Sequence, residues 1–211
     1  MIVKIENLSK SFKRNVIFKN VNIELKPGHI YGIIGRNGTG KTVLLKTICG
    51  ILNADTGRIL FDEEETLKST GVPKSTRALI ENPEMINELT GFENLKLISS
   101  IQNTINDDRI KEVLKLVGLD NEYNKKFKNY SLGMKQKLGI AQVIMEDADL
   151  LIFDEPFNGL DNKSCNDMRK LFKDLKNQGK IIIIATHVKE DIDNLIDVLY
   201  RIDNGSLIHE K

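Results

Sequence analysis

A glycine-rich segment near the beginning of the chain has the residue types and spacing to bind phosphate. Residues 35–42 read Gly-Arg-Asn-Gly-Thr-Gly-Lys-Thr, which fits the pattern G-x-x-x-x-G-K-[ST]. Glycines let the backbone curl so that successive N–H groups face phosphate oxygens, and a following helix adds its positive N-terminus. Lys41 can neutralise phosphate charge, and Thr42 can offer a hydroxyl to Mg²⁺. A glycine-rich turn with a chance lysine, the alternative, does not explain the strand pattern before the motif and the helix pattern after it.

An apolar run that ends in two carboxylates is the second chemical signal. Residues 150–155 read Leu-Leu-Ile-Phe-Asp-Glu, and Pro156 ends the run. Ligands of open α/β sheets bind at the carboxyl edge, so a buried strand of this kind delivers its acids to the ligand. We expect Asp154 to hold Mg²⁺, directly or through water, and Glu155 to polarise the attacking water as a general base. The alternative is a surface Asp-Glu-Pro turn, and the phosphate motif in the same chain weighs against it.

The elements that must position these residues can be predicted from periodicity and turn signals. Strand patterns in the opening third occur at residues 1–12, 58–61 and 77–80. Residues 21–25 and 29–34 flank the turn Lys26-Pro27-Gly28, which predicts a hairpin. A helix over residues 41–49, closed by Gly50, should follow the phosphate motif.

From about residue 83 to residue 146 the pattern becomes helical. Residues 90–93, Thr-Gly-Phe-Glu, form a capping box ahead of a helical run at 94–101. Residues 109–117 are apolar at helical spacing, and Ser131 caps a further helix. We interpret this stretch as a helical insertion.

The last third alternates strands and helices again. A buried strand is expected at residues 149–153, and Asp161 caps a helix that runs to about residue 178. The isoleucine-rich segment 181–185 is typical of a parallel strand covered on both faces. A hairpin is expected around Asp203-Asn204-Gly205. The predicted class is α/β with a helical subdomain.

Size and composition bound the function classes. A chain of 211 residues can form one good core, alone or with a small satellite domain. A net charge of +1 gives no overall field that attracts nucleic acid. Cys49 and Cys165 lie far apart without a C-x-x-C pattern, which favours reduced thiols in a cytoplasmic protein. No apolar run approaches the ~18 residues that cross a bilayer, so transport would need another chain to supply the spans.

A third segment makes a family resemblance specific. Residues 130–136, Tyr-Ser-Leu-Gly-Met-Lys-Gln, resemble the LSGGQ signature, and the chain resembles the nucleotide-binding domain of ABC (ATP-binding cassette) transporters along essentially its whole length. The resemblance implies a P-loop NTPase fold: a mostly parallel sheet, an N-terminal antiparallel β subdomain and a helical insertion. In the family, the signature binds the γ-phosphate of ATP held by the opposite subunit. The Ser131 hydroxyl, the Gly133 amide and the helix N-terminus suit such an anion site.

Three further segments match the family in order. Phe12 stands where an aromatic ring stacks on adenine, although a core phenylalanine on an early strand is the alternative. Residues 158–161, Asn-Gly-Leu-Asp, match the D-loop, which runs along the dimer interface. His187, after the strand pattern, matches the switch histidine that contacts the γ-phosphate. A lone histidine is more often structural, and this placement favours the functional interpretation.

The chain departs from the family pattern at two positions. Leu132 replaces the first signature glycine, and Glu81 takes the place of the usual Q-loop glutamine. A glutamate there can still ligate Mg²⁺ and water, but it adds negative charge beside ATP. Both departures resemble the subgroup that exports bacitracin-like and lantibiotic peptides and confers self-immunity.

The expected site follows from motifs and resemblance together, within a single ABC domain over residues 1–211 whose helical subdomain spans roughly 83–146. The expected catalytic residues are Glu155 and His187, and the expected Mg²⁺ ligands are Thr42, Glu81 and Asp154. The residues expected to contact ATP are Phe12, Gly35, Arg36, Asn37, Gly38, Thr39, Gly40, Lys41, Thr42, Val43, Ser131, Gly133, Met134 and Asp161. The resemblance implies ATP and Mg²⁺ as cofactors. It also implies a second ABC subunit, most simply an identical one, and separate transmembrane permease subunits at the inner face of the cell membrane.

Two other function classes also carry a phosphate loop of this kind. A soluble ABC ATPase without a transport role would act in iron–sulfur assembly, on the ribosome or in DNA repair. Ribosome-acting members usually carry two cassettes in one chain, and repair members carry a long coiled coil, whereas this chain has one cassette and no heptad run. The iron–sulfur type stays open as the alternative. A small-molecule kinase would share the phosphate loop but would need neither signature nor D-loop.

Overall fold

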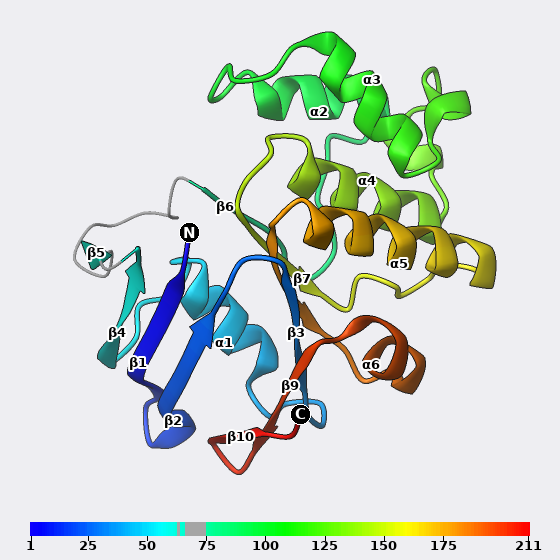
Figure 1. Cartoon of the computed structure of the whole chain (residues 1–211). Helices are drawn as coiled ribbons and strands as arrows, with labels where there is room; N and C mark the ends of the chain where they lie inside the picture. Colours follow the sequence, from blue (N-terminus) through cyan, green and yellow to red (C-terminus); the bar gives the residue numbers. More distant parts are fainter. Residues whose placement is uncertain (63, 66–74) are drawn as a thin grey trace.

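The chemical motifs lie at one edge of the larger of two β-sheets. The computed structural model describes residues 1–62, 64–65 and 75–211. Within them the larger sheet has the strand order β10-β9-β3-β8-β7-β6, with β10 antiparallel to β9 and the other neighbours parallel (Figure 1). Its strands are β3 (His29–Ile34), β6 (Thr76–Leu79), β7 (Leu150–Asp154), β8 (Ile181–Ala185), β9 (Val198–Asp203) and β10 (Ser206–His209).

A smaller antiparallel sheet of N-terminal strands packs against the first helix. Its order in the described residues is β2-β1-β4-β5, and its strands are β1 (Val3–Phe12), β2 (Asn15–Leu25), β4 (Thr56–Phe61) and β5 (Glu64–Glu65). One apolar core joins both sheets to helix α1 (Lys41–Ile48), whose Leu44, Leu45 and Ile48 are buried in it. The helix that follows the phosphate motif is therefore held between two sheets.

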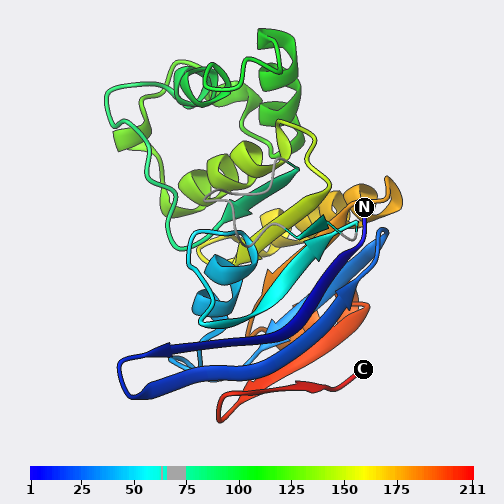
Figure 2. The ribbon, with the colours of Figure 1, turned by 90° about the vertical axis from the view of Figure 1, so that its left-hand side faces the viewer.

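The remaining helices cover the other face of the large sheet and extend beyond it. They are α2 (Gly91–Ser99), α3 (Asp107–Leu116), α4 (Leu132–Ile144), α5 (Asn162–Asn177) and α6 (Lys189–Leu195), with short 3₁₀ turns at Asp120–Glu122 and Phe127–Asn129. Figure 2 shows α2 and α3 at the end of the molecule away from the β1–β2 hairpin. Phe153 of β7 and Phe172 of α5 pack with ring centroids 4.7 Å apart. None of the helices in the described residues is both long and apolar enough to span a membrane.

Strand β8 shows why the sheet is buried on both faces. Ile181 and Ile183 belong to the core beneath α1, whereas Ile182 and Ile184 belong to the core beneath the other helices. All five residues of β8 are buried. This confirms the prediction of a doubly covered parallel strand, since such strands are continuously apolar instead of alternating.

The predicted hairpin between residues 21–25 and 29–34 is wrong. Strand β2 pairs with β1 in the small sheet, and β3 pairs with β8 and β9 in the large one. The turn at residues 26–28 therefore carries the chain from one sheet to the other. Burial explains the difference: β2 alternates buried and exposed residues along its second half, as an antiparallel strand does, whereas four consecutive residues of β3 are buried.

The other predicted elements are confirmed, with small shifts at their ends. Asn204 and Gly205 have φ values of 47° and 77° between paired Asp203 and Ser206, which is the expected two-residue hairpin. Ser131 and Asp161 accept hydrogen bonds at the N-termini of α4 and α5. Helix α6 was not predicted, because its seven residues show one apolar pair at helical spacing, Ile192 and Leu195.

The capping box gives a test of how this helical region is stabilised. The Glu93 N–H donates to Thr90 Oγ1 at 3.2 Å, and the Thr90 N–H donates to Glu93 Oε2 at 2.7 Å. Thr90→Ala removes the first bond, so we expect the free energy of unfolding to fall by about 1 kcal/mol in urea denaturation. Thr90→Ser keeps the hydroxyl and should match the parent protein. Equal stability of the alanine and serine variants would contradict the capping role.

Candidate active site

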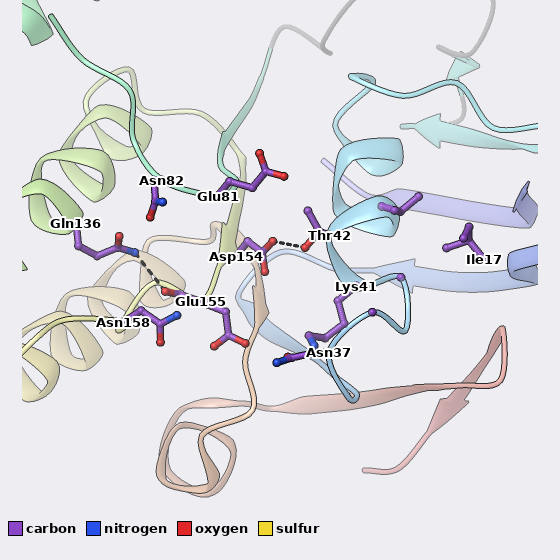
Figure 3. A pocket seen from close by; sticks show the side chains of 13 residues that line it. Ile17, Asn37, Lys41, Thr42, Glu81, Asn82, Gln136, Asp154, Glu155 and Asn158 are labelled. Atoms are coloured by element: carbon purple, nitrogen blue, oxygen red, sulfur yellow. Dashed lines mark hydrogen bonds between the residues drawn. The ribbon is translucent and has the colours of Figure 1, made fainter. Parts of the chain in front are cut away.

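A cleft of about 460 Å³ lies at the carboxyl edge of the large sheet, beside the N-terminus of α1 (Figure 3). Its volume is in the range of small-molecule and cofactor sites. The lining residues come from the phosphate motif, from the ends of β6 and β7, from β2, from α4 and from the loop before α5. They are Ile17, Asn37, Gly38, Gly40, Lys41, Thr42, Val43, Glu81, Asn82, Gln136, Asp154, Glu155 and Asn158.

The phosphate motif forms one wall of the cleft, as a loop closed by its own lysine. Lys41 Nζ donates to the carbonyl oxygens of Gly35 at 2.8 Å and Arg36 at 3.3 Å, and the residue is only 7% exposed. Gly40 has a φ of 102°, and a Cβ there would lie 2.5 Å from Ile17 Cγ2. Glycine is therefore required where β2 crosses the loop. The ammonium is held at the cleft wall, where it can exchange loop carbonyls for phosphate oxygens.

Two of the three expected Mg²⁺ ligands are in contact. Thr42 Oγ1, in the first turn of α1, donates to Asp154 Oδ2 at 2.6 Å. A hydroxyl and a carboxylate are hard oxygen donors that suit Mg²⁺, which is usually completed by substrate phosphates and water. In the described residues no group of three His, Cys, Asp or Glu side chains forms a ready metal cage. The hydroxyl of Thr42 and the carboxylate of Asp154 fit a Mg²⁺ ion whose other ligands are phosphate oxygens and water.

The third expected ligand, Glu81, lines the same cleft but makes a different contact. Its Oε1 lies 2.7 Å from Lys46 Nζ, one turn along α1 from Thr42. The Glu81 backbone has a φ of 64°, and its side chain is 65% exposed. In Figure 3, Asp154 lies between Glu81 and Glu155. Lys46 thus supplies a positive charge beside this carboxylate.

The two expected catalytic residues form a pair. His187 Nδ1 lies 2.8 Å from Glu155 Oε1, with the imidazole 62% exposed and the carboxylate 21% exposed. The Glu155 N–H donates to the carbonyl of Ala185 at 2.9 Å, and Gln136 Nε2 donates to the Glu155 carbonyl at 3.2 Å. These bonds hold Glu155 at a φ of 50°, which non-glycine residues rarely adopt. The ends of β7 and β8 thus bring residues distant in sequence into contact.

Several residues that the sequence predicts to contact ATP do not line the cleft. Phe12, at the end of β1, is 46% exposed and has Lys10 Nζ 5.3 Å from its ring centroid, but it does not line the cleft. Gly35, Arg36 and Thr39 belong to the phosphate loop without lining the cleft. His187 reaches the cleft through Glu155.

The signature residues and the D-loop lie together on a neighbouring surface. Ser131 Oγ accepts from the Met134 N–H at 3.2 Å. A Cβ on Gly133 would lie 2.8 Å from the carbonyl oxygen of Gly159, and one on Gly159 would lie 2.6 Å from Leu132 Cγ. The Ser164 N–H, which donates to Asp161, holds the pKa of that carboxyl below its ordinary value. Leu132, Gly133 and Gly159 therefore lie close to one another outside the cleft, whereas Gln136 of the signature and Asn158 of the D-loop line it.

Sequence reasoning missed four lining residues. Gln136 is the last residue of the signature and Asn158 the first of the D-loop, so both stood in motifs already recognised. Asn82 follows Glu81 directly. Ile17 carries no sequence signal, because its place depends on how β2 crosses the loop.

Known proteins match the chain along most of its length. The sequence profile of the family described as "ABC transporter" matches residues 18–158. The chain is 36% identical over 206 residues to the ABC transporter ATP-binding protein YybJ of Bacillus subtilis, covering 98% of this chain and 94% of that protein. It is 34% identical over 211 residues to the bacitracin transport ATP-binding protein BcrA of Enterococcus faecalis (99% and 68% covered). It is 33% identical over 210 residues to the lantibiotic transport ATP-binding protein SrtF of Streptococcus pyogenes (100% and 90%).

A solved structure described as the ATP-binding subunit of an ABC transporter superposes with a TM-score of 0.90. The superposition covers 100% of this chain and 90% of the solved chain, at 24% sequence identity. At this level of identity the likeness supports the fold alone.

The closed phosphate loop makes binding the first property to test. Lys41→Ala removes the cation that faces the cleft, so ATP affinity should fall on the order of 10²-fold, since a charge-assisted contact is lost. Isothermal calorimetry measures this directly. Lys19→Ala, an exposed lysine on β2, is the matched control and should bind ATP normally. Near-normal affinity in a folded Lys41→Ala protein would contradict the assignment of the loop.

Proposed function

The chain belongs to the ABC transporter family, and from this premise we propose that it powers export of a peptide antibiotic or a related substrate through separate membrane subunits. Its place in the family makes it an ATP-binding subunit with ATPase activity. The observation that carries the ATP-hydrolysing part of this proposal is the shared edge of the sheet. There the lysine of the phosphate loop, the Thr42–Asp154 contact and the Glu155–His187 pair line or adjoin one cleft.

We assign the roles as follows. The phosphate loop binds the ATP phosphates, with Lys41 as the principal cation and Val43 in the first turn of the helix beneath them. Thr42 and Asp154 would hold Mg²⁺, and Glu81 would be a further oxygen ligand of the ion. Glu155 polarises the attacking water, and His187 orients Glu155 and contacts the γ-phosphate. Phe12 is proposed to stack on adenine, which requires the base to extend out of the cleft toward β1.

The working form is proposed to be a head-to-tail dimer. Ser131, Gly133, Met134 and Asp161 do not line the cleft of their own chain, so they are free to contact ATP held by a second subunit. Leu132 is 62% exposed beside them and packs over Gly159, which joins the signature to the D-loop in one surface. The N-terminus of α4 gives this surface a site for the γ-phosphate.

Peptide export is supported by two features of the sequence and by the relatives. Glu81 stands in the glutamine position, Leu132 stands in the first signature glycine position, and two relatives are named for bacitracin and lantibiotic transport. We propose that residues 1–211 act as one ABC domain with a helical subdomain over roughly 83–146. Closure of the dimer would be transmitted to permease subunits through the groove between the Glu81 segment and that subdomain. The protein would then sit on the inner face of the cell membrane, held by those subunits.

Glu81 tests both the metal role and the coupling role. Glu81→Ala should lower ATP turnover roughly tenfold, because a group that orients the metal shell is lost, and should leave ATP affinity largely intact. Glu81→Gln should keep substantial activity. Turnover in vitro and peptide resistance of cells that express the chain with its membrane subunits are the two measurements. Glu84→Ala, in the same exposed segment, is the control. Unchanged hydrolysis and unchanged resistance in Glu81→Ala would contradict the assignment.

Glu155→Gln tests mechanism and assembly together. The change keeps size and removes the negative charge, so turnover should fall on the order of 10²-fold or more while ATP binding survives. With hydrolysis blocked, two ATP molecules should stay between paired subunits. Light scattering should therefore detect a dimer with ATP and a monomer with ADP, which lacks the γ-phosphate.

The control for this experiment is Lys41→Ala combined with Glu155→Gln, which should stay monomeric with either nucleotide. Normal hydrolysis by Glu155→Gln would remove Glu155 from the catalytic role. An inactive variant that stays monomeric with ATP would count against a self-paired dimer and would point to a different cassette as the partner.

A further inference from the structure

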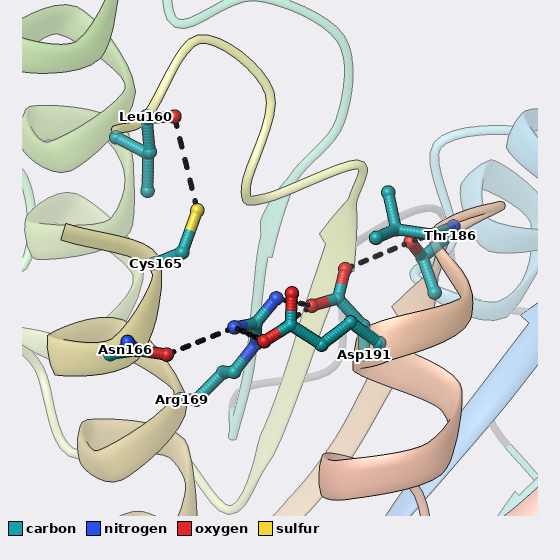
Figure 4. Close-up of polar contacts among 8 residues, drawn as sticks. Leu160, Cys165, Asn166, Arg169, Thr186 and Asp191 are labelled. Carbon is teal, nitrogen blue, oxygen red and sulfur yellow. Dashed lines mark hydrogen bonds and ion pairs between the residues drawn. The ribbon is translucent and has the colours of Figure 1, made fainter. Parts of the chain in front are cut away.

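A buried ion pair joins the two helices that flank the histidine segment. Arg169 of α5 donates from Nε at 2.9 Å and from Nη2 at 2.6 Å to Oδ1 of Asp191 in α6 (Figure 4). Arg169 Nη1 donates to Glu190 at 2.8 Å and to Asn166 at 3.0 Å. Asp191 is 0% exposed and Arg169 is 8% exposed. A pair this deeply buried holds its partners in one geometry, because any alternative would leave a charge unpaired.

The second oxygen of Asp191 is directed at the end of strand β8. Asp191 Oδ2 accepts from Thr186 Oγ1 at 3.3 Å, and that hydroxyl accepts from the N–H of Val188 at 3.1 Å. Thr186 is 1% exposed. The residue between Thr186 and Val188 is His187. The Thr186 hydroxyl therefore bridges the two residues on either side of His187. The hydroxyl is in turn held by Asp191, one partner of the ion pair.

Arg169 also connects this segment to the D-loop. The last residue of the D-loop, Asp161, is the N-cap of helix α5, and this helix carries Arg169. The guanidinium lies 5.5 Å from the ring centroid of Phe157, two residues after Glu155. The same side chain thus contacts the segment that leads from Glu155 to the D-loop and the helix that follows His187.

We propose that Arg169 and Asp191 are positioning residues, which fix the Thr186 hydroxyl and so hold His187 where its imidazole contacts Glu155. This rests on the proposed function of Glu155 and His187 as the catalytic pair. Neither positioning residue lines the cleft, so their effect is on turnover and not on ATP binding. A shift of α5 at the D-loop would reach His187 through the same contacts.

The sharpest variant is Thr186→Val, because it leaves the ion pair intact and removes the hydroxyl while keeping the shape of the side chain. Turnover should fall about tenfold or more, since small misplacements of catalytic groups are costly, and the Kd for ATP should stay within about twofold. Thr186→Ser keeps the hydroxyl and should restore turnover. Wild-type turnover in a folded Thr186→Val protein would overturn the proposal.

A second variant separates positioning from stability. Arg169→Met with Asp191→Leu replaces the ion pair by apolar side chains, which often preserves or raises the unfolding temperature. A positioning role requires turnover to stay low in this folded double variant, because Thr186 has lost its acceptor. If the apolar pair restores stability and full turnover together, the ion pair is structural and the proposal is wrong.

A spectroscopic measurement tests the positioning without relying on hydrolysis. The chain has three histidines, His29, His187 and His209, so ¹⁵N-histidine labelling gives few signals, and His187→Gln assigns the relevant one. Above the titration range of histidine, the parent protein should show His187 as the Nδ1–H tautomer, because Nδ1 faces the Glu155 carboxylate. Thr186→Val should reduce that tautomer preference. An unchanged preference would overturn the proposal.

If the parent protein failed to hydrolyse ATP, the proposed function would fail, and the tautomer comparison would still decide the positioning role.

Discussion

Strands β3, β8 and β7 hydrogen-bond side by side in parallel, with Gly32 opposite Ile184 and Ile184 opposite Phe153. Parallel neighbours end at the same edge, so the segments that follow the three strands must meet there. One segment is the phosphate loop, one carries Glu155 and one carries His187. Interactions in the cleft depend on this register, because a strand slipped by one residue would turn its side chains to the opposite face. The isoleucines of β8, buried on both faces, fix that register.

Meeting at one edge imposes a second requirement on the backbone. The segments that follow β3, β6 and β7 turn away sharply, and positive φ values occur there at Gly40, Glu81 and Glu155. Glycine adopts such angles freely, whereas a glutamate costs of order 1–3 kcal/mol and persists when its surroundings over-determine it. Glu155 is held by backbone and side-chain bonds on both sides, and Glu81 by the ammonium of Lys46. The backbone strain at these two glutamates is thus retained at residues that line the cleft.

The features that could be predicted from the sequence are those encoded locally. The phosphate loop, the caps at Thr90, Ser131 and Asp161, and the C-terminal hairpin depend on residues a few positions apart, and the structure has them. Contacts set by strand order could not be found this way. The hairpin predicted around residues 26–28 failed because the sequence marks a turn without saying which strands the turn joins. The pairing of Glu81 with Lys46 depends on how the segment after β6 packs beside α1, and that of Arg169 with Asp191 on how α5 packs beside α6, so no spacing rule reveals them.

The place of β3 between β8 and β9 has a consequence for how the protein is made. A ribosome completes β3 early, yet both of its neighbours, β8 and β9, are synthesised much later. Until residues 181–203 leave the exit tunnel, the strand that leads into the phosphate loop has two unpaired edges, an arrangement that favours association with other chains. The nascent chain therefore cannot assemble the cleft stepwise. The nucleotide site therefore forms as a unit, after β8 and β9 have both left the exit tunnel.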